Sequence, residues 1–171
     1  MKTFATTLIA LLIGVSAFAQ QDFPRNEVSV NLVTTTLLQY PIISYERILA
    51  PDFSIGASLG FNLGDEYFLD FNLTPFVRWY FGGNRETMNR AGTGFFIEGS
   101  TALYSSNRGR DNFMGEGSFQ SAIDVGIGAG IGWKYLTRSN WTGEVLVGGG
   151  RSLSGATIGY LRGGVSIGRR F

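Results

Sequence analysis

The residues of this chain that could do chemistry are mostly charged side chains on alternate positions of short apolar segments. Because successive side chains of a β-strand point to opposite faces, these charges would share the face opposite the bulky apolar residues. The set holds five acids and four bases: Glu46, Asp70, Glu98, Asp124, Glu144, Arg78, Lys134, Arg162 and Arg170. Unpaired charges in a narrow interior are costly, so the near balance of signs predicts a cross-linked charge network that plugs it. The other interpretation is a narrow path for water, protons or small ions through the same charges.

The absence of His and Cys limits the reactions that this chain can catalyse. A Ser nucleophile activated by His is excluded, and so are metal sites built from His or thiolate ligands. Paired carboxylates could still do acid-base chemistry, but the spacing of the interior acids singles out no two of them. We therefore expect no enzymatic activity, no cofactor and no metal site.

The first residues predict an export signal. Lys2 precedes an uncharged apolar run over residues 4–18, and the small residues Ala17 and Ala19 suit cleavage after residue 19. The run is shorter than the about 20 residues that a membrane-spanning helix needs, which disfavours the alternative of an N-terminal anchor helix. We expect residues 1–19 to be a signal peptide and residues 20–171 to form one domain.

The net charge argues against a nucleic-acid partner. Removing residues 1–19 takes Lys2 away and leaves 13 Lys and Arg against 13 Asp and Glu. A chain that binds nucleic acid normally carries a basic stripe, which this neutral chain does not show.

After residue 20 the chain alternates apolar and polar residues at period two, with turn residues between the segments. We expect eight strands, over residues 27–37, 42–49, 53–63, 68–81, 94–105, 119–136, 141–151 and 158–171. Polar connections are expected over residues 82–93 and 107–118. An even number of strands returns an up-and-down meander to the side where it began, as in bacterial outer-membrane barrels.

The two faces of these strands differ in the size of their residues. Over residues 53–62 one face is bulky and the other small: Phe53, Ile55, Ala57, Leu59 and Phe61 against Ser54, Gly56, Ser58, Gly60 and Asn62. An eight-stranded barrel is just wide enough inside for packed side chains, so small and polar residues belong inside, where glycines leave room for large or charged neighbours across the lumen. Large apolar residues then lie outside, where they require lipid. The pattern predicts an all-β fold, an eight-stranded antiparallel up-and-down transmembrane β-barrel.

Aromatic residues in the outward phase gather near one end of their strands, which we expect to face the periplasm. They are Phe53, Trp79, Phe81, Phe95, Trp133, Tyr135 and Trp141, with Phe171 at the end of the last strand. Amphipathic rings settle at the level of lipid headgroups, so this placement predicts an interfacial aromatic girdle. The other interpretation is packing of rings under turns.

The signal sequence, the eight alternating segments and the final residues 166–171 together resemble the small outer-membrane β-barrel proteins of the OmpA-like, porin-superfamily type. The resemblance covers residues 20–171. It implies that Phe171, with Val165 and Ile167 before it, is the signal read by the barrel-assembly machinery. These motifs specify an architecture and no activity.

We therefore expect an integral barrel of a Gram-negative outer membrane, in contact with lipid and lipopolysaccharide, with a structural or interaction role or narrow passage of small solutes. The sequence does not identify a protein partner. One alternative is a soluble periplasmic lipocalin-like barrel that binds an apolar ligand with its faces reversed. Another is an outer-membrane hydrolase that uses an interior carboxylate such as Asp70 or Asp124.

Overall fold

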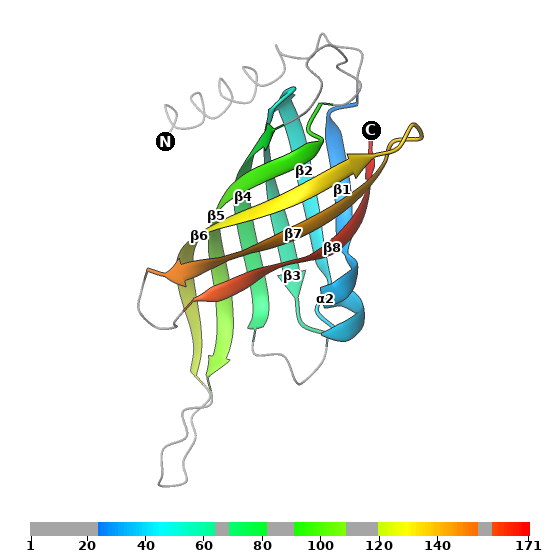
Figure 1. Ribbon diagram of the computed structural model, residues 1–171. Coiled ribbons are helices and arrows are strands. Elements are labelled where there is room, and N and C mark those ends of the chain that lie inside the picture. The colour runs from blue at the N-terminus through cyan, green and yellow to red at the C-terminus, as the bar shows by residue number, and fades with distance from the viewer. Residues whose placement is uncertain (1–23, 64–68, 82–90, 109–119, 154–158) are drawn as a thin grey trace, which may run out of the picture.

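Eight antiparallel strands follow one another around a closed barrel in the computed structural model, which describes residues 24–63, 69–81, 91–108, 120–153 and 159–171 (Figure 1). The strands are β1 (Asn26–Asn31), β2 (Ile42–Ala50), β3 (Phe53–Phe61), β4 (Leu69–Phe81), β5 (Gly94–Arg108), β6 (Gln120–Leu136), β7 (Trp141–Ser152) and β8 (Tyr160–Arg170). The predicted all-β, eight-stranded up-and-down barrel is confirmed. The predicted signal peptide, residues 1–19, lies outside the described residues.

The prediction of a strand over residues 27–37 is wrong in its second half. β1 ends at Asn31, and a short helix, α2 (Leu32–Leu37), follows it. The Asn31 side chain caps this helix by accepting a hydrogen bond from the Thr34 backbone N–H at 3.1 Å. The hydroxyls of Thr35 and Thr36 donate to carbonyls four residues earlier in the chain. These local hydrogen bonds stabilise a helix in a Thr-rich segment whose composition favours a strand.

The remaining strands agree with the sequence prediction to within a few residues. The largest difference is in β5, which continues to Arg108 where the sequence predicted an end at residue 105. Of the two predicted polar connections, residues 109–118 of the one over 107–118 and residues 82–90 of the one over 82–93 lie outside the described residues.

The first and last strands close the barrel at the end where the described chain begins and finishes. The Asn26 N–H donates to the Phe171 carbonyl at 3.0 Å, and the Phe171 N–H donates to the Asn26 carbonyl at 2.7 Å. We call this the terminal end and the opposite one, where α2 lies, the loop end (Figure 1). The β2–β3 turn at Pro51 and Asp52 is also at the terminal end.

Large apolar side chains cover the outside of the barrel. In β7, Trp141 and Val145 are exposed, whereas Thr142 and Glu144 are buried. The exposed fraction reaches 93% for Leu161 of β8. The polar face of each strand is therefore the interior face, as the period-two pattern predicted. Among the described residues, no helix is both long and apolar enough to cross a membrane.

Inward glycines lie under aromatic rings. A Cβ at Gly132 would lie 2.4 Å from the Phe96 ring, and one at Gly150 would lie 2.3 Å from the Tyr160 ring. In both cases the ring belongs to the residue paired with the glycine on the neighbouring strand, so the expectation of neighbours across the lumen is wrong for them. The cause is barrel curvature, which folds the ring of an inward aromatic residue over the adjacent backbone.

We expect Gly132→Val to lower the free energy of unfolding by roughly 1–3 kcal/mol, because the new side chain overlaps the Phe96 ring. Urea unfolding of the refolded protein measures this. Gly143→Val is the control, since no heavy atom lies within 4 Å of a Cβ there. Equal losses in the two variants would contradict the close approach to Phe96 as the reason for glycine.

Candidate functional site

Charged side chains from seven of the eight strands meet inside the barrel, all of them buried except the half-buried Arg162. We call them the ionic cluster: Glu27, Glu46, Glu98, Glu144, Arg78, Lys134, Arg162 and Arg170. Four carboxylates face four cations, so the cluster as described is electrically balanced. Balance matters because an unpaired charge in a low-dielectric interior costs several kcal/mol, on the order of 3–5.

Arg78 of β4 joins three other strands. Its Nε donates to Glu98 at 2.9 Å, and its Nη1 donates to Glu46 at 2.6 Å. Nη1 and Nη2 both donate to Glu144, at 2.7 and 2.8 Å. A planar guanidinium has five N–H donors in fixed directions, which suits a contact that must reach three carboxylates at once.

Two aromatic rings enclose the Arg78 guanidinium. Its central carbon lies 4.4 Å from the Phe76 ring centroid and 4.5 Å from that of Phe96. The faces of aromatic rings carry negative potential and attract a cation. The rings also exclude water from the hydrogen bonds of Arg78, which fixes the side chain in one position.

A pair of like charges occurs where β1 and β2 run side by side. Glu27 and Glu46 are directly opposite each other in the register, an arrangement that destabilises a sheet when it stands alone. Lys134 of β6 reaches across the lumen, and its Nζ lies 2.8 Å from Glu27 and 2.5 Å from Glu46. The ammonium group therefore holds together two carboxylates that would otherwise repel.

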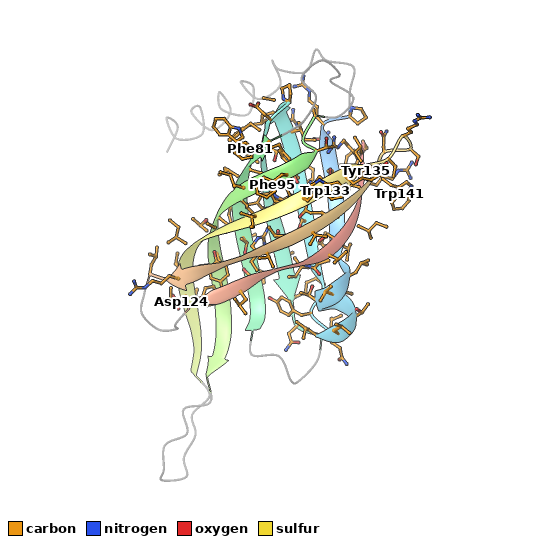
Figure 2. The ribbon with its side chains drawn as sticks, viewed as in Figure 1. Phe81, Phe95, Asp124, Trp133, Tyr135 and Trp141 are labelled. Atoms are coloured by element: carbon orange, nitrogen blue, oxygen red, sulfur yellow. The ribbon has the colours of Figure 1, made fainter. Side chains whose placement is uncertain are left out.

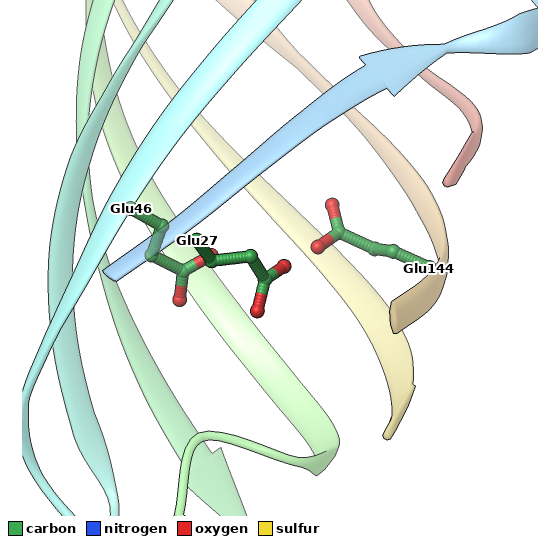
Figure 3. A group of neighbouring side chains, drawn as sticks. All are labelled: Glu27, Glu46 and Glu144. Atoms are coloured by element: carbon green, nitrogen blue, oxygen red, sulfur yellow. The ribbon is translucent and has the colours of Figure 1, made fainter. Parts of the chain in front are cut away.

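Glu144 of β7 completes a group of three carboxylates around this ammonium. Figure 3 shows the side chains of Glu27, Glu46 and Glu144 turned toward one another inside the barrel. One oxygen of each lies within 4.8 Å of the others, and Lys134 Nζ is 3.2 Å from Glu144. Three carboxylate oxygens this close form a surrounding that hard cations prefer, and here the cation is the lysine side chain.

Glu46 accepts more hydrogen bonds than the two cations supply. The hydroxyls of Tyr80 and Ser54 both donate to its Oε1, each at 2.5 Å. A carboxylate with donors on both oxygens regains much of the solvation lost on burial. Glu46 is therefore held as a structural acceptor.

The two inward arginines of β8, Arg162 and Arg170, extend the cluster along the barrel axis. Arg162 Nε donates to Glu98 at 2.5 Å. At the terminal end, Arg170 Nη2 donates to Glu27 at 3.0 Å, and Arg170 Nη1 donates to the Ala91 carbonyl at 2.6 Å. Arg170 thereby fastens the backbone just before β5 to the first and last strands.

Nearer the loop end the interior is filled by a second group, the tyrosine layer, which consists of Tyr40, Tyr104 and Tyr160 packed with Ala102. The rings of Tyr104 and Tyr160 have centroids 5.7 Å apart. The lumen is thus occupied at two depths, by charges toward the terminal end and by aromatic rings toward the loop end.

The structure brings seven of the nine predicted interior charges together in the ionic cluster. Asp124 is buried, but it lies toward the loop end, where it accepts hydrogen bonds from Tyr104 and Ser152 at 3.2 and 2.8 Å. Asp70 lies in β4, and its side chain is outside the described residues. Glu27 was missed, although its alternation with Val28 and Val30 places it on the inward face. A six-residue strand has few apolar residues from which to predict which of its side chains face inward.

The seven residues of the predicted aromatic girdle lie on β3 to β7, near the terminal end. Trp79 and Phe81 have ring centroids 6.3 Å apart, and Phe81 and Phe95 6.1 Å apart. Trp133 and Tyr135 are 6.0 Å apart, and Figure 2 shows them in one band with Phe81, Phe95 and Trp141. Phe53 is at the start of β3, and Phe171, just after β8, is 61% exposed.

Comparison with known proteins supports the fold. No protein-family model matches the chain, and no curated protein sequence matches it. Among solved structures, the chain is similar to the crystal structure of the N-terminal β-barrel domain of Pseudomonas aeruginosa OprF, with 16% sequence identity and a TM-score of 0.62. The alignment covers 88% of this chain and 100% of that one. At this identity the similarity shows a common fold, the closed eight-stranded barrel.

We expect Lys134→Met to lower the free energy of unfolding by about 3–5 kcal/mol, because it leaves three carboxylates facing one another without their ammonium partner. Urea unfolding in detergent micelles measures the loss.

The double variant Lys134→Met with Glu27→Gln is the internal control for charge. It restores the balance of signs and removes the like-charge pair, so the two changes together are expected to cost less than their sum by about 1–3 kcal/mol. Additive losses would show that Lys134 contributes packing alone.

Proposed function

We propose that this chain is an integral barrel protein of a bacterial outer membrane, with a closed lumen and a structural or interaction role. The observation that carries the proposal is that apolar side chains lie outside and charged ones inside, the reverse of their distribution in a water-soluble protein. Exposed fractions are 93% for Leu161 and 72% for Ile123 on the outside, against 1% for Lys134 and 3% for Glu98 inside. An apolar surface this extensive is stable only in contact with lipid, and a closed barrel leaves no unpaired strand edge in the bilayer.

The terminal end would face the periplasm. Bacterial barrels have short turns there and longer connections on the outer side. The two-residue turn at Pro51 and Asp52 fits this assignment, and the aromatic residues of β3 to β7 would then mark the inner membrane interface. Phe171 at the same end is suited to serve as the signal for the assembly machinery.

The two occupied depths of the lumen support a structural role over open transport. An ion crossing the barrel would have to break salt bridges of the ionic cluster and then displace the tyrosine layer. Narrow passage is the second candidate, and it is favoured by one observation: Glu98 is shared between Arg78 and Arg162, so its pairing can be exchanged.

We propose no catalytic role for the interior carboxylates. Glu46 is held by Arg78 and Lys134, and Glu144 is held by the same two cations. Carboxylates tied in this way are poor general bases, because a proton can be taken up only by giving up a salt bridge. The lipocalin-like alternative would need the bulky apolar residues to face inward, which is the opposite of their orientation on β7 and β8.

The location can be tested by cell fractionation. We expect the protein to stay with the membrane pellet after washing with alkaline carbonate, because lipid contact with the outward apolar face is not broken by loss of ionic interactions. Release into the wash together with periplasmic proteins would contradict the proposal and support a soluble barrel.

The closed lumen can be tested by single-channel recording in planar bilayers. We expect no steps, or only small ones, from the wild-type protein, and larger ones from Glu98→Ala, which deprives Arg78 and Arg162 of their shared partner. Arg162→Ala should act in the same direction. Arg151→Ala, whose side chain faces outward, is the control. Large stable steps from the wild type would refute the closed lumen.

A further inference from the structure

The described acidic side chains of the strands all lie on the inward face of the barrel, whereas the outward face carries only basic ones. Every strand carboxylate whose side chain the structure describes is buried: Glu27, Glu46, Glu98, Asp124 and Glu144. The outward face carries arginines, namely Arg47 of β2, Arg151 of β7 and Arg169 of β8. All charged residues that the described strands place on the outward face are therefore cationic, and this is the face that the proposed function puts against lipid.

Two of these arginines lie close to the terminal end on the strands that flank β1. In the register, Val28 of β1 is paired with Arg169 on one side and with Tyr45 on the other. Asn26, two residues earlier, is paired with Arg47. Arg47 and Arg169 are thus separated by the width of a single strand and by two residues along it.

Aromatic and amide groups accompany the two arginines. The Arg169 guanidinium lies 5.9 Å from the ring centroid of Trp141, the residue paired with it on β7. The Tyr45 hydroxyl donates to the Asn26 side-chain oxygen at 2.8 Å. We call these five residues the basic patch: Asn26, Tyr45, Arg47, Trp141 and Arg169.

The charge of the basic patch is not neutralised by the described part of the chain. No carboxylate among the described residues lies within salt-bridge distance of Arg47 or Arg169; all the ion pairs seen are inside the barrel. A guanidinium facing lipid is costly unless it reaches the headgroup region and finds an anion there. An anionic group at headgroup level would supply that counter-charge.

We propose that the basic patch binds the phosphate of an anionic phospholipid in the membrane leaflet at the terminal end. Arginine matches a phosphodiester through paired N–H donors, and Trp141 and Tyr45 have the amphipathic rings that settle at headgroup level. A net anionic headgroup fits better than a zwitterionic one, because the ammonium group of the latter would approach two guanidinium groups that form no salt bridge with the described residues. The inference rests on the proposed membrane location.

The test is lipid retention measured by native mass spectrometry. The purified protein is reconstituted into vesicles of equal parts phosphatidylglycerol and phosphatidylcholine, extracted in mild detergent, and its bound lipids are counted. We expect preferential retention of phosphatidylglycerol, reduced about fivefold by Arg47→Gln or Arg169→Gln and further by both, since a basic residue near anionic lipid contributes about that factor. Arg151→Gln, at the other end of the outward face, should keep the wild-type preference.

Each other outcome decides against the proposal. No preference in the wild type, an unchanged preference in the double variant, or an equal loss in Arg151→Gln would overturn it. A double variant that assembles poorly in cells but retains phosphatidylglycerol normally would assign the patch to an assembly contact. Circular dichroism confirms that the variants fold. Failure of the wild type to insert into vesicles would refute the proposed membrane location, whereas insertion without lipid preference would refute this inference alone.

Discussion

Closure of the sheet by the pairing of β1 with β8 is the constraint on which the rest of the structure depends. It puts Glu27 between Arg170 on one side and Glu46 on the other, and it turns the inward face of every strand toward one narrow space. Charges that would face water on an open sheet are then buried together. The members of the ionic cluster can remain ionised there because each finds an opposite charge within hydrogen-bonding distance.

Salt bridges across the lumen do in this barrel much of what an apolar core does in a water-soluble protein. Arg78 and Lys134 lie on β4 and β6, and the carboxylates that they hold come from β1, β2, β5 and β7. Apolar contacts inside are confined to smaller groups, such as Tyr80 with Phe96 and Leu146. The position of each strand is therefore specified by polar contacts that tolerate little change in geometry.

The separation of charge between the two faces connects the fold to its surroundings. The described acidic side chains of the strands lie inside, where cations of the same chain pair with most of them, and the outward arginines form no salt bridge with the described residues. The aromatic residues of β3 to β7 and the basic patch around β1 occupy the same end of the barrel. That end therefore presents aromatic rings on one part of its circumference and arginines on another, which are the groups that the proposed membrane interface requires.

Local alternation was enough for the sequence to determine the number of strands, the face of most strand residues and the membership of most of the ionic cluster, because the side-chain period of a strand depends only on neighbouring residues. It failed where local hydrogen bonds compete with the strand, as at Asn31, and where a strand is short, as at Glu27. Only the tertiary structure decided how deep each inward charged side chain lies in the lumen and which side chain it pairs with. Lys134 and Glu27 form an ion pair although they are 107 residues apart in the chain, and Asp124 lies on the same inward face but at a different depth. Both the pairing and the depth depend on the strand register around the closed barrel.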